Sequence, residues 1–492
     1  MAGVEVRRRG RRLWRIALIT GVVATVLGAA GSWIPSFWGD EAASIMSASR
    51  TWPELWRMLL NVDGVHGVYY AFLHLWIGAF GASEFSVRLP SAIAAGFVAA
   101  GTAVLAGRLG GARLALVTGL VAAALPRTTL MAAEGRSYAI GSAIAVWLTV
   151  LLIALLARRR PWWAWACYAL GLAAAVYVFL YLVLLVLVHG LFLLLHRGRF
   201  GRWAAAAGTG VALALPIVLL AASERAQIGF LSGHDYLTPF DVLALQWFDP
   251  VLAIPCWALI LIGLSGALRA RRTAPRRLRL AVLATIWLAL PTTAIAVASV
   301  VIAPMYTVRY LSFCTPAAAI LIGFGVQELG CVVARRHPTR TPVATGIALA
   351  VLLAAFIPGW VVQREPFAKD GSDWREAADQ LHAQASAGAA VVFDERPKNS
   401  EKPRLILATY PAAFADLRDP ALLVPFRERP GLWDETRPND SLTVDELGPD
   451  VWAVERGSAP ADSPDARHLQ ALGYRIVSAH RVNVTTLLHL ER

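Results

Sequence analysis

Two adjacent carboxylates, Asp40 and Glu41, follow the first long apolar segment of the chain. A carboxylate that is partly shielded from water holds a proton more readily, which suits it to act as a general base. Adjacent residues on a helix point to different sides. We therefore expect one of the two to face a cavity and the other to brace the loop. The alternative is simple helix initiation, because Asp before Glu-Ala-Ala-Ser is a favourable start for a helix.

A second set of polar residues follows in the same loop. Asp63, His66, Tyr70 and His74 are spaced by three, four and four residues, so on a helix they would form one stripe. Such a stripe could bind a phosphate or sugar hydroxyls, or a divalent metal through Asp63 and His66. For Tyr70 and His74 the alternative is anchoring in the lipid headgroup layer.

Charged residues also occur at the ends of later apolar segments. Glu134 and Arg136 lie between two such segments, Tyr138 begins the second of them, and Arg309-Tyr310 lies at the start of another. Ionisable groups at membrane depth are costly and are usually functional or paired. The guanidinium group of Arg309 is well matched to phosphate. The alternatives are a surface ion pair between Glu134 and Arg136, and interfacial anchoring by Arg309-Tyr310.

The composition indicates that transmembrane helices position these residues. Hydrophobic residues make up 57 % of the 492 residues and charged residues 16 %, whereas soluble chains carry about 25 % charged residues. Apolar runs of spanning length predict about eleven transmembrane helices. They lie near 13–32, 88–107, 113–132, 138–157, 162–179, 181–195, 203–222, 251–269, 281–302, 310–330 and 342–361. The run over 68–80 is short, and we interpret it as an interfacial or re-entrant helix.

The arginines predict the orientation of these helices. Arginine-rich stretches fall in alternate loops, at 7–15, 108–113, 158–160, 197–202, 269–279 and 335–340. The positive-inside rule makes these loops cytoplasmic. Ten of the twelve carboxylates of residues 1–363, from Asp40 to Asp249, fall in the opposite loops. We therefore expect a cytoplasmic N-terminus, a first apolar segment retained as a signal anchor, and an outward-facing first loop over 33–87.

Residues 364–492 have a different composition. They hold 16 basic and 21 acidic side chains and all three lysines, so the basic excess belongs to residues 1–363. This distribution gives nucleic-acid binding little weight. Short apolar runs predict strands at 389–393, 451–454, 474–477 and 482–489, with helices over 373–385 and 466–472. We expect a small extracytoplasmic α/β domain without a phosphate loop or metal motif, serving structure or acceptor docking.

Five motifs in order resemble one family. They are Asp40-Glu41, His66-Gly-Val-Tyr69-Tyr70, Glu84-Phe85-Ser-Val-Arg88-Leu89-Pro90-Ser91, Glu134-Gly-Arg136-Ser-Tyr138, and Arg309-Tyr310 followed by Pro316. Their order and topology resemble the GT-C superfamily of membrane glycosyltransferases, in the branch with protein O-mannosyltransferases and lipid A aminoarabinose transferases. The chain departs from the family pattern at Gly67-Val68, where the family usually has two prolines.

The resemblance implies a sugar donor carried on a polyprenyl phosphate and transfer at the outer face of a bacterial cytoplasmic membrane. Asp40 would be the general base, with Glu41 beside it, and the reaction would invert the anomeric carbon. The donor and substrate site would include Asp63, His66, Tyr70, Arg88, Glu134, Arg136, Tyr138, Arg309 and Tyr310. The acceptor would be an envelope lipid, glycan or protein. Metal dependence stays open, with Asp40, Glu41, Asp63 and His66 as candidate ligands.

Two other classes of protein remain as alternatives. A transporter or flippase would place charges in the middle of broken helices and show internal repeats, whereas here the span interiors carry almost no charge. A non-catalytic scaffold for envelope assembly would not need Asp40. The one-sided clustering of carboxylates favours an enzyme with an active site on one face of the membrane.

Overall fold

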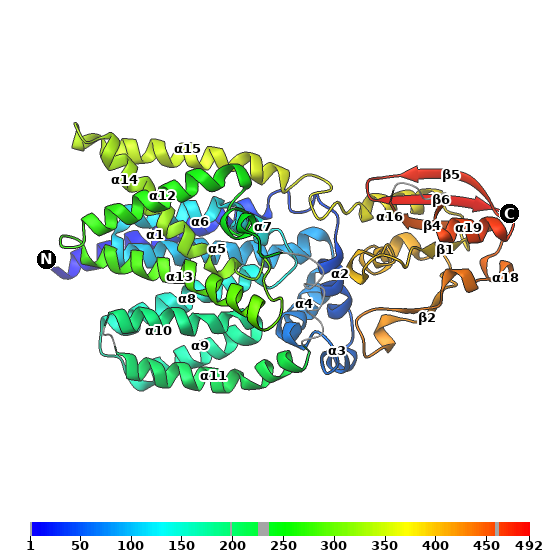
Figure 1. Cartoon of the computed structure of the whole chain (residues 1–492), viewed down its shortest axis with the longest axis horizontal. Coiled ribbons are helices and arrows are strands. Elements are labelled where there is room, and N and C mark those ends of the chain that lie inside the picture. The colour runs from blue at the N-terminus through cyan, green and yellow to red at the C-terminus, as the bar shows by residue number, and fades with distance from the viewer. Residues whose placement is uncertain (1, 197–198, 225–235, 458–461) are drawn as a thin grey trace. The chain divides into compact units, whose positions relative to one another are not determined.

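The computed structural model describes residues 2–196, 199–224, 236–457 and 462–492 (Figure 1). Contacts within the chain divide it into two compact units. The first unit contains residues 1–30, 65–68 and 88–361, and the second contains 31–64, 69–87 and 362–492. Arg197 and Asp235, which contributed to the predicted orientation, lie outside the described residues.

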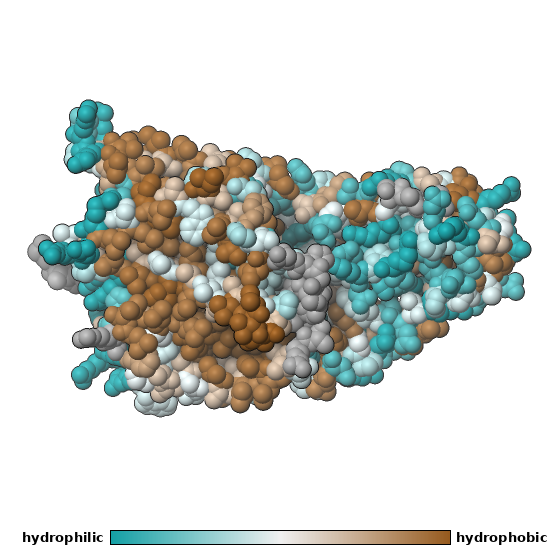
Figure 2. Space-filling model, in the orientation of Figure 1, coloured by the Kyte–Doolittle hydropathy of each residue, from teal (hydrophilic) through white to brown (hydrophobic). Residues whose placement is uncertain are grey.

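The first unit is built from long apolar helices. They are α1 (Ala2–Ala29), α5 (Glu84–Gly110), α6 (Ala112–Ala124), α7 (Pro126–Ala132), α8 (Tyr138–Ala157), α9 (Trp162–Val178), α10 (Leu185–Leu195), α11 (Phe200–Ser223), α12 (Pro250–Arg269), α13 (Pro275–Val301), α14 (Thr315–Val333) and α15 (Thr341–Val362). The visible surface over these helices is mostly apolar, whereas the surface over the C-terminal residues is mostly hydrophilic (Figure 2). This is the pattern expected of a polytopic membrane protein.

Each predicted span coincides with a helical segment. Among the described residues, eight helices are long and apolar enough to cross a membrane, and the bent pair α6 and α7 makes a ninth candidate. The segments Trp162–Val178 and Leu180–Leu195 are shorter apolar helices and match the remaining two predictions. The expected fold class is therefore confirmed. It is a mostly helical multi-span membrane domain followed by a small α/β region.

The chain reverses direction between α9 and α10. Phe179 has an extended backbone, with φ −155° and ψ 107°, and ends α9. The Tyr168 hydroxyl then lies 2.7 Å from Nδ1 of His189, which is 21 positions further along the chain. A single kinked helix could not bring these two side chains together, because 21 helical residues span about 30 Å. The segment over 162–195 therefore forms two helices that lie side by side.

Small residues allow the helices of this unit to pack closely. At Gly325 of α14, a Cβ atom would overlap the backbone carbonyl of Leu259 in α12, and a Cβ at Gly263 would lie 2.6 Å from the backbone nitrogen of Gly325. Membrane helices commonly associate through such small residues, because they let two backbones approach.

The second unit combines part of the first loop with the C-terminal residues. Its helices are α2 (Gly39–Ala48), α3 (Trp52–Leu59), most of α4 (Gly67–Phe80), α16 (Trp374–Gln384), α17 (Leu405–Thr409), α18 (Val444–Leu447) and α19 (Pro464–Ala471). Its strands are β1 (Ala390–Phe393), β2 (Leu422–Val424), β3 (Glu435–Thr436), β4 (Asp450–Arg456), β5 (Arg475–Arg481) and β6 (Thr485–Glu491). The predicted strands and the two predicted helices are confirmed.

The main sheet of this unit has the order β1-β4-β6-β5. Strands β1 and β4 are parallel, with Phe393 opposite Val454, and the other two pairings are antiparallel. Helix α2 shares a hydrophobic core with one face of this sheet, where Ala42 and Met46 pack with Trp374 and Leu381 of α16. The acidic helix of the first loop is therefore part of the same compact body as the C-terminal sheet.

Candidate active site

The adjacent carboxylates differ in their exposure. Asp40 and Glu41 both lie in the first turn of α2, where a negative charge is favoured by the helix dipole. Glu41 is completely buried, whereas Asp40 is half-buried. The N-cap residue is Trp38, and no side chain caps this end. Asp40 is therefore not the N-cap of α2, although it lies in the first turn of that helix, and it is the more accessible of the two carboxylates.

Close backbone packing fixes the start of α2. A Cβ atom at Gly39 would overlap the carbonyl oxygen of Ser400, which belongs to a 3-10 turn over Asn399–Glu401. At the other end of the helix, the fully buried guanidinium of Arg50 donates to the carbonyl oxygens of Arg429, at 3.0 Å, and Gly431, at 2.7 Å. Contacts at both ends therefore hold α2 against the C-terminal residues.

The second polar set of the first loop is not a helical stripe. Asp63 precedes the helix and has a left-handed backbone with φ 57°. The buried Tyr70 of α4 donates its hydroxyl to Oδ2 of Asp63 at 2.9 Å, so Tyr70 points inward rather than anchoring in headgroups. His74 contacts the carbonyl oxygen of Ala48 at 2.9 Å. His66 lies in the 3-10 turn over Gly64–His66 and itself belongs to the first unit.

The Glu84-to-Arg88 motif divides between the two units. Glu84, within the second unit, accepts a hydrogen bond from Tyr410 at 2.7 Å and pairs with Arg375 at 3.2 Å. Arg375 also donates to the carbonyl oxygen of Trp33 at 2.9 Å. Glu84 thus helps to hold the segment before α2. Arg88 belongs to the first unit and is completely buried in α5.

A group of buried charges lies within the first unit. Glu134 is only 5 % exposed, so it is not one half of a surface ion pair. Arg127 of α7 is also buried, and its charge is attracted by Glu134 and repelled by Arg309. The backbone carbonyl of Arg136 accepts a hydrogen bond from the Ser91 hydroxyl at 3.2 Å. Glu134 and Arg309, which the sequence pointed out separately, therefore both act on the charge of Arg127.

Aromatic rings pack beside these charges. The ring of Tyr310 lies 4.8 Å from that of Tyr181, and 6.4 Å from the rings of Tyr138 and Phe179. The Tyr181 hydroxyl donates to the carbonyl oxygen of Met305 at 2.9 Å. Tyr138 and Tyr310, predicted separately from the sequence, thus belong to one aromatic cluster.

Arg127 also belongs to a polar network that the sequence did not reveal. Its side chain donates to the backbone carbonyls of Leu245 and Gln246. The buried Gln246 side chain then accepts from Tyr306 at 2.8 Å and donates to Thr292 at 3.0 Å. This network connects α7 with α13 and with the segment before Arg309. Arg127 could have been recognised from the sequence, because it is an ionisable residue within an apolar segment.

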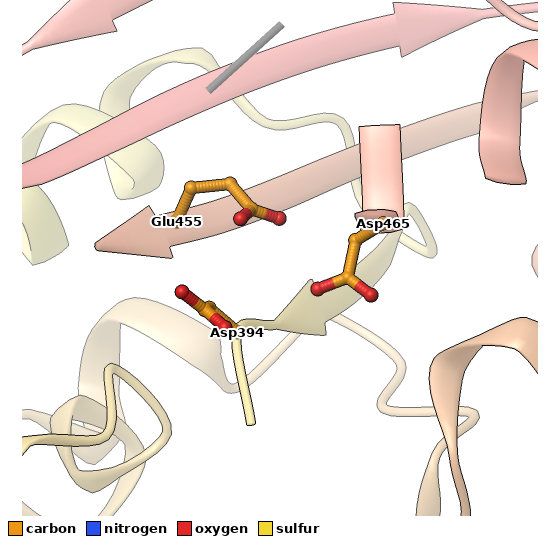
Figure 3. Close-up of side chains that lie close together, drawn as sticks. All are labelled: Asp394, Glu455 and Asp465. Carbon is orange, nitrogen blue, oxygen red and sulfur yellow. The ribbon is translucent and has the colours of Figure 1, made fainter. Parts of the chain in front are cut away.

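One group of carboxylates could hold a metal ion. It consists of Asp394, Glu455 and Asp465 in the second unit, with one oxygen of each within 4.8 Å of the others (Figure 3). Among the described residues, it is the one group of three or more His, Cys, Asp or Glu side chains with this geometry. It contains none of the four candidate ligands predicted in the first loop.

Comparison with known proteins identifies the fold. The structure is similar to that of ArnT from Cupriavidus metallidurans in the apo state, with a TM-score of 0.58, 16 % identity, and coverage of 96 % of this chain and 97 % of ArnT. The chain has a GT-C fold. ArnT bound to undecaprenyl phosphate gives a TM-score of 0.56 and 17 % identity, with coverage of 96 % and 97 %.

A more distant likeness agrees with this result. The apo oligosaccharyltransferase of Archaeoglobus fulgidus gives a TM-score of 0.51 and 10 % identity, over 90 % of this chain and 69 % of that one. No protein-family model and no curated protein sequence matches the chain. The GT-C resemblance expected from the motifs is therefore confirmed at the level of the fold.

Proposed function

We propose that the chain is a membrane glycosyltransferase that moves a sugar from a polyprenyl-phosphate donor to an envelope acceptor. The observation that carries the proposal is the buried charged group around Arg127. There the buried Arg127 guanidinium is attracted by the carboxylate of Glu134 and repelled by the guanidinium of Arg309. Guanidinium groups suit a phosphate group, and buried charges in membrane proteins usually serve function.

The fold supports the same class of donor. ArnT, which this chain resembles over nearly its whole length, has been crystallised with undecaprenyl phosphate bound. In our proposal Arg136 and Arg309 bind the phosphate of the donor, and Arg88 and Glu134 complete the donor site. The aromatic rings of Tyr138 and Tyr310 would pack against the sugar or the lipid, since such rings offer both an apolar face and a polar hydroxyl.

The proposed reaction is an inverting substitution. The carboxylate of Asp40 takes the proton of an acceptor hydroxyl, and the hydroxyl oxygen attacks the anomeric carbon of the sugar. The bond from that carbon to the lipid phosphate breaks, and Arg309 stabilises the departing anion. The half-buried position of Asp40 supports its role over that of Glu41, because a general base must reach its substrate. Asp63, His66 and Tyr70 contribute to substrate binding in this proposal.

The orientation in the membrane is part of the proposal. From the arginine-rich loops and the positive-inside rule, we infer that the N-terminus lies in the cytoplasm and that the first loop and residues 364–492 lie outside the cytoplasmic membrane of a bacterium. Residues 364–492 would form the extracytoplasmic domain that docks the acceptor, following the transmembrane domain of residues 1–363. Protease added to spheroplasts should then cleave residues 364–492. Protection of these residues until the membrane is lysed would contradict the orientation.

The function is tested with purified protein in nanodiscs. A panel of radiolabelled polyprenyl-phosphate sugars is incubated with host membrane extract, and sugar transfer and donor hydrolysis are both measured. We expect one donor to be consumed. Undecaprenyl phosphate should bind the wild type at least tenfold more tightly than Arg309→Gln, whereas the exposed Arg335→Gln should bind like the wild type. No donor consumption together with equal carrier binding by all three proteins would contradict the proposal.

A further inference from the structure

The parallel pairing of β1 and β4 helps to bring three carboxylates of the C-terminal residues close together. Asp394 directly follows β1, and Glu455 lies near the end of the parallel neighbour β4. Because Phe393 is opposite Val454, the residues that follow them, Asp394 and Glu455, lie next to each other at the same end of the two strands. Asp465, in the first turn of α19, completes the group (Figure 3).

Most of this cluster is removed from water. Asp394 is 2 % exposed and Glu455 is 1 % exposed, while Asp465 is half-buried. One cation, Arg396, offsets part of their charge. It contacts Asp394 at 2.7 and 2.9 Å and Oε2 of Glu455 at 3.0 Å. Three carboxylates against one guanidinium leave two negative charges uncompensated when all are ionised, and buried charges without a partner are costly.

One oxygen of the cluster is left over. Oε1 of Glu455 is buried and has no hydrogen-bond partner among the described residues, and the carboxylate points toward those of Asp394 and Asp465 (Figure 3). Next to the cluster, the amide of Asn439 contacts Asp465, and its buried Oδ1 also lacks a partner within the described part of the chain. A buried acceptor without a donor is rare in proteins, and a bound ion or water is one explanation for it.

We propose that Asp394, Glu455 and Asp465 form a binding site for an oxygen-preferring divalent cation such as Ca²⁺ or Mg²⁺. Carboxylate and amide oxygens are the ligands these ions favour, and the cluster offers no sulfur or imidazole ligand that would select zinc. The ion supplies the two missing positive charges and gives Oε1 of Glu455 a partner. It connects the ends of β1 and β4 to the start of α19 and stabilises that region.

The site is tested by binding to the full chain in nanodiscs after chelation and buffer exchange. Radioactive Ca²⁺ is measured by equilibrium dialysis, and Mg²⁺ is measured separately by calorimetry. We expect one saturable site and a rise in the thermal unfolding midpoint on ion addition. Glu455→Gln and the less buried Asp465→Asn should each weaken binding at least tenfold, whereas the exposed Asp416→Asn should bind like the wild type.

The Arg396→Gln variant distinguishes a cation site from a cluster whose role is purely structural. Arg396→Gln removes the competing positive charge, so the proposal expects tighter ion binding even if the apo protein becomes less stable. A structural role alone would weaken the protein in the acid variants and in Arg396→Gln alike, with no dependence on the ion. Absence of saturable binding to the wild type, or unchanged binding by Asp465→Asn, would overturn the proposal. None of these measurements requires sugar transfer.

Discussion

Replacing Arg50 by methionine should loosen the helix that carries Asp40. The Arg50 guanidinium makes two short hydrogen bonds, to the carbonyl oxygens of Arg429 and Gly431, and both are shielded from water. A hydrogen bond from a charged donor contributes about 1.5–3 kcal/mol, so the two bonds represent about 3–6 kcal/mol. Part of this is recovered, because methionine needs no desolvation, and we expect a net loss of about 2–4 kcal/mol in stability.

The assay is thermal unfolding in detergent, followed by tryptophan fluorescence and by proteolysis of the C-terminal residues. For a unit of this size, about 2–4 kcal/mol corresponds to a fall in the midpoint of roughly 4–16 °C. Arg57→Met is the matched control, because Arg57 lies on the neighbouring α3 and is exposed. Equal midpoints for Arg50→Met, Arg57→Met and the wild type would refute the reasoning that Arg50 holds α2 in place.

Two further predictions concern packing. Gly39→Ala should lower the unfolding midpoint, because the new methyl group overlaps the carbonyl oxygen of Ser400, whereas a Cβ at the control position Gly78 meets nothing within 4 Å and Gly78→Ala should be neutral or slightly stabilising. Equal midpoints for the two variants would show that this close approach is not rigid. Tyr168→Phe removes the hydroxyl that contacts Nδ1 of His189 and accepts a hydrogen bond from Trp203, and it should cost about 0.5–2 kcal/mol, as for other hydrogen bonds between membrane helices. Unfolding in sodium dodecyl sulfate measures this loss, and no loss would mean that water or another side chain replaces the hydroxyl.

The membrane helices could be predicted from the sequence because few backbone structures can span a lipid bilayer. A segment that crosses a bilayer must satisfy its own backbone and expose apolar side chains, so its length and composition show in the sequence. For residues 162–195 one long kinked helix stayed open as an alternative, and the arginine pattern only favoured the break at Phe179 that the structure shows. The strand over Ala390–Phe393 could also be predicted, because its four residues are all apolar, and all four are buried in the structure.

Features that depend on contacts between distant residues could not be predicted. Ala42 and Met46 look like ordinary helix residues, and nothing in the sequence shows that they pack against Trp374. The meeting of Asp394 and Glu455 requires the parallel register of β1 and β4, although each of the two follows a predicted apolar strand. The helical stripe from Asp63 was wrong because the chain turns there with a positive φ, which spacing alone does not reveal.

The most direct test of the proposed function compares sugar transfer by the wild type and Asp40→Asn in nanodiscs with the active donor. The substitution keeps the size of the side chain and removes its ability to accept a proton. We expect transfer to fall by at least a hundredfold, the order of magnitude that general-base catalysis supplies, while donor binding and the unfolding midpoint stay unchanged. Transfer at the wild-type rate by Asp40→Asn would contradict the assignment of Asp40 as the base.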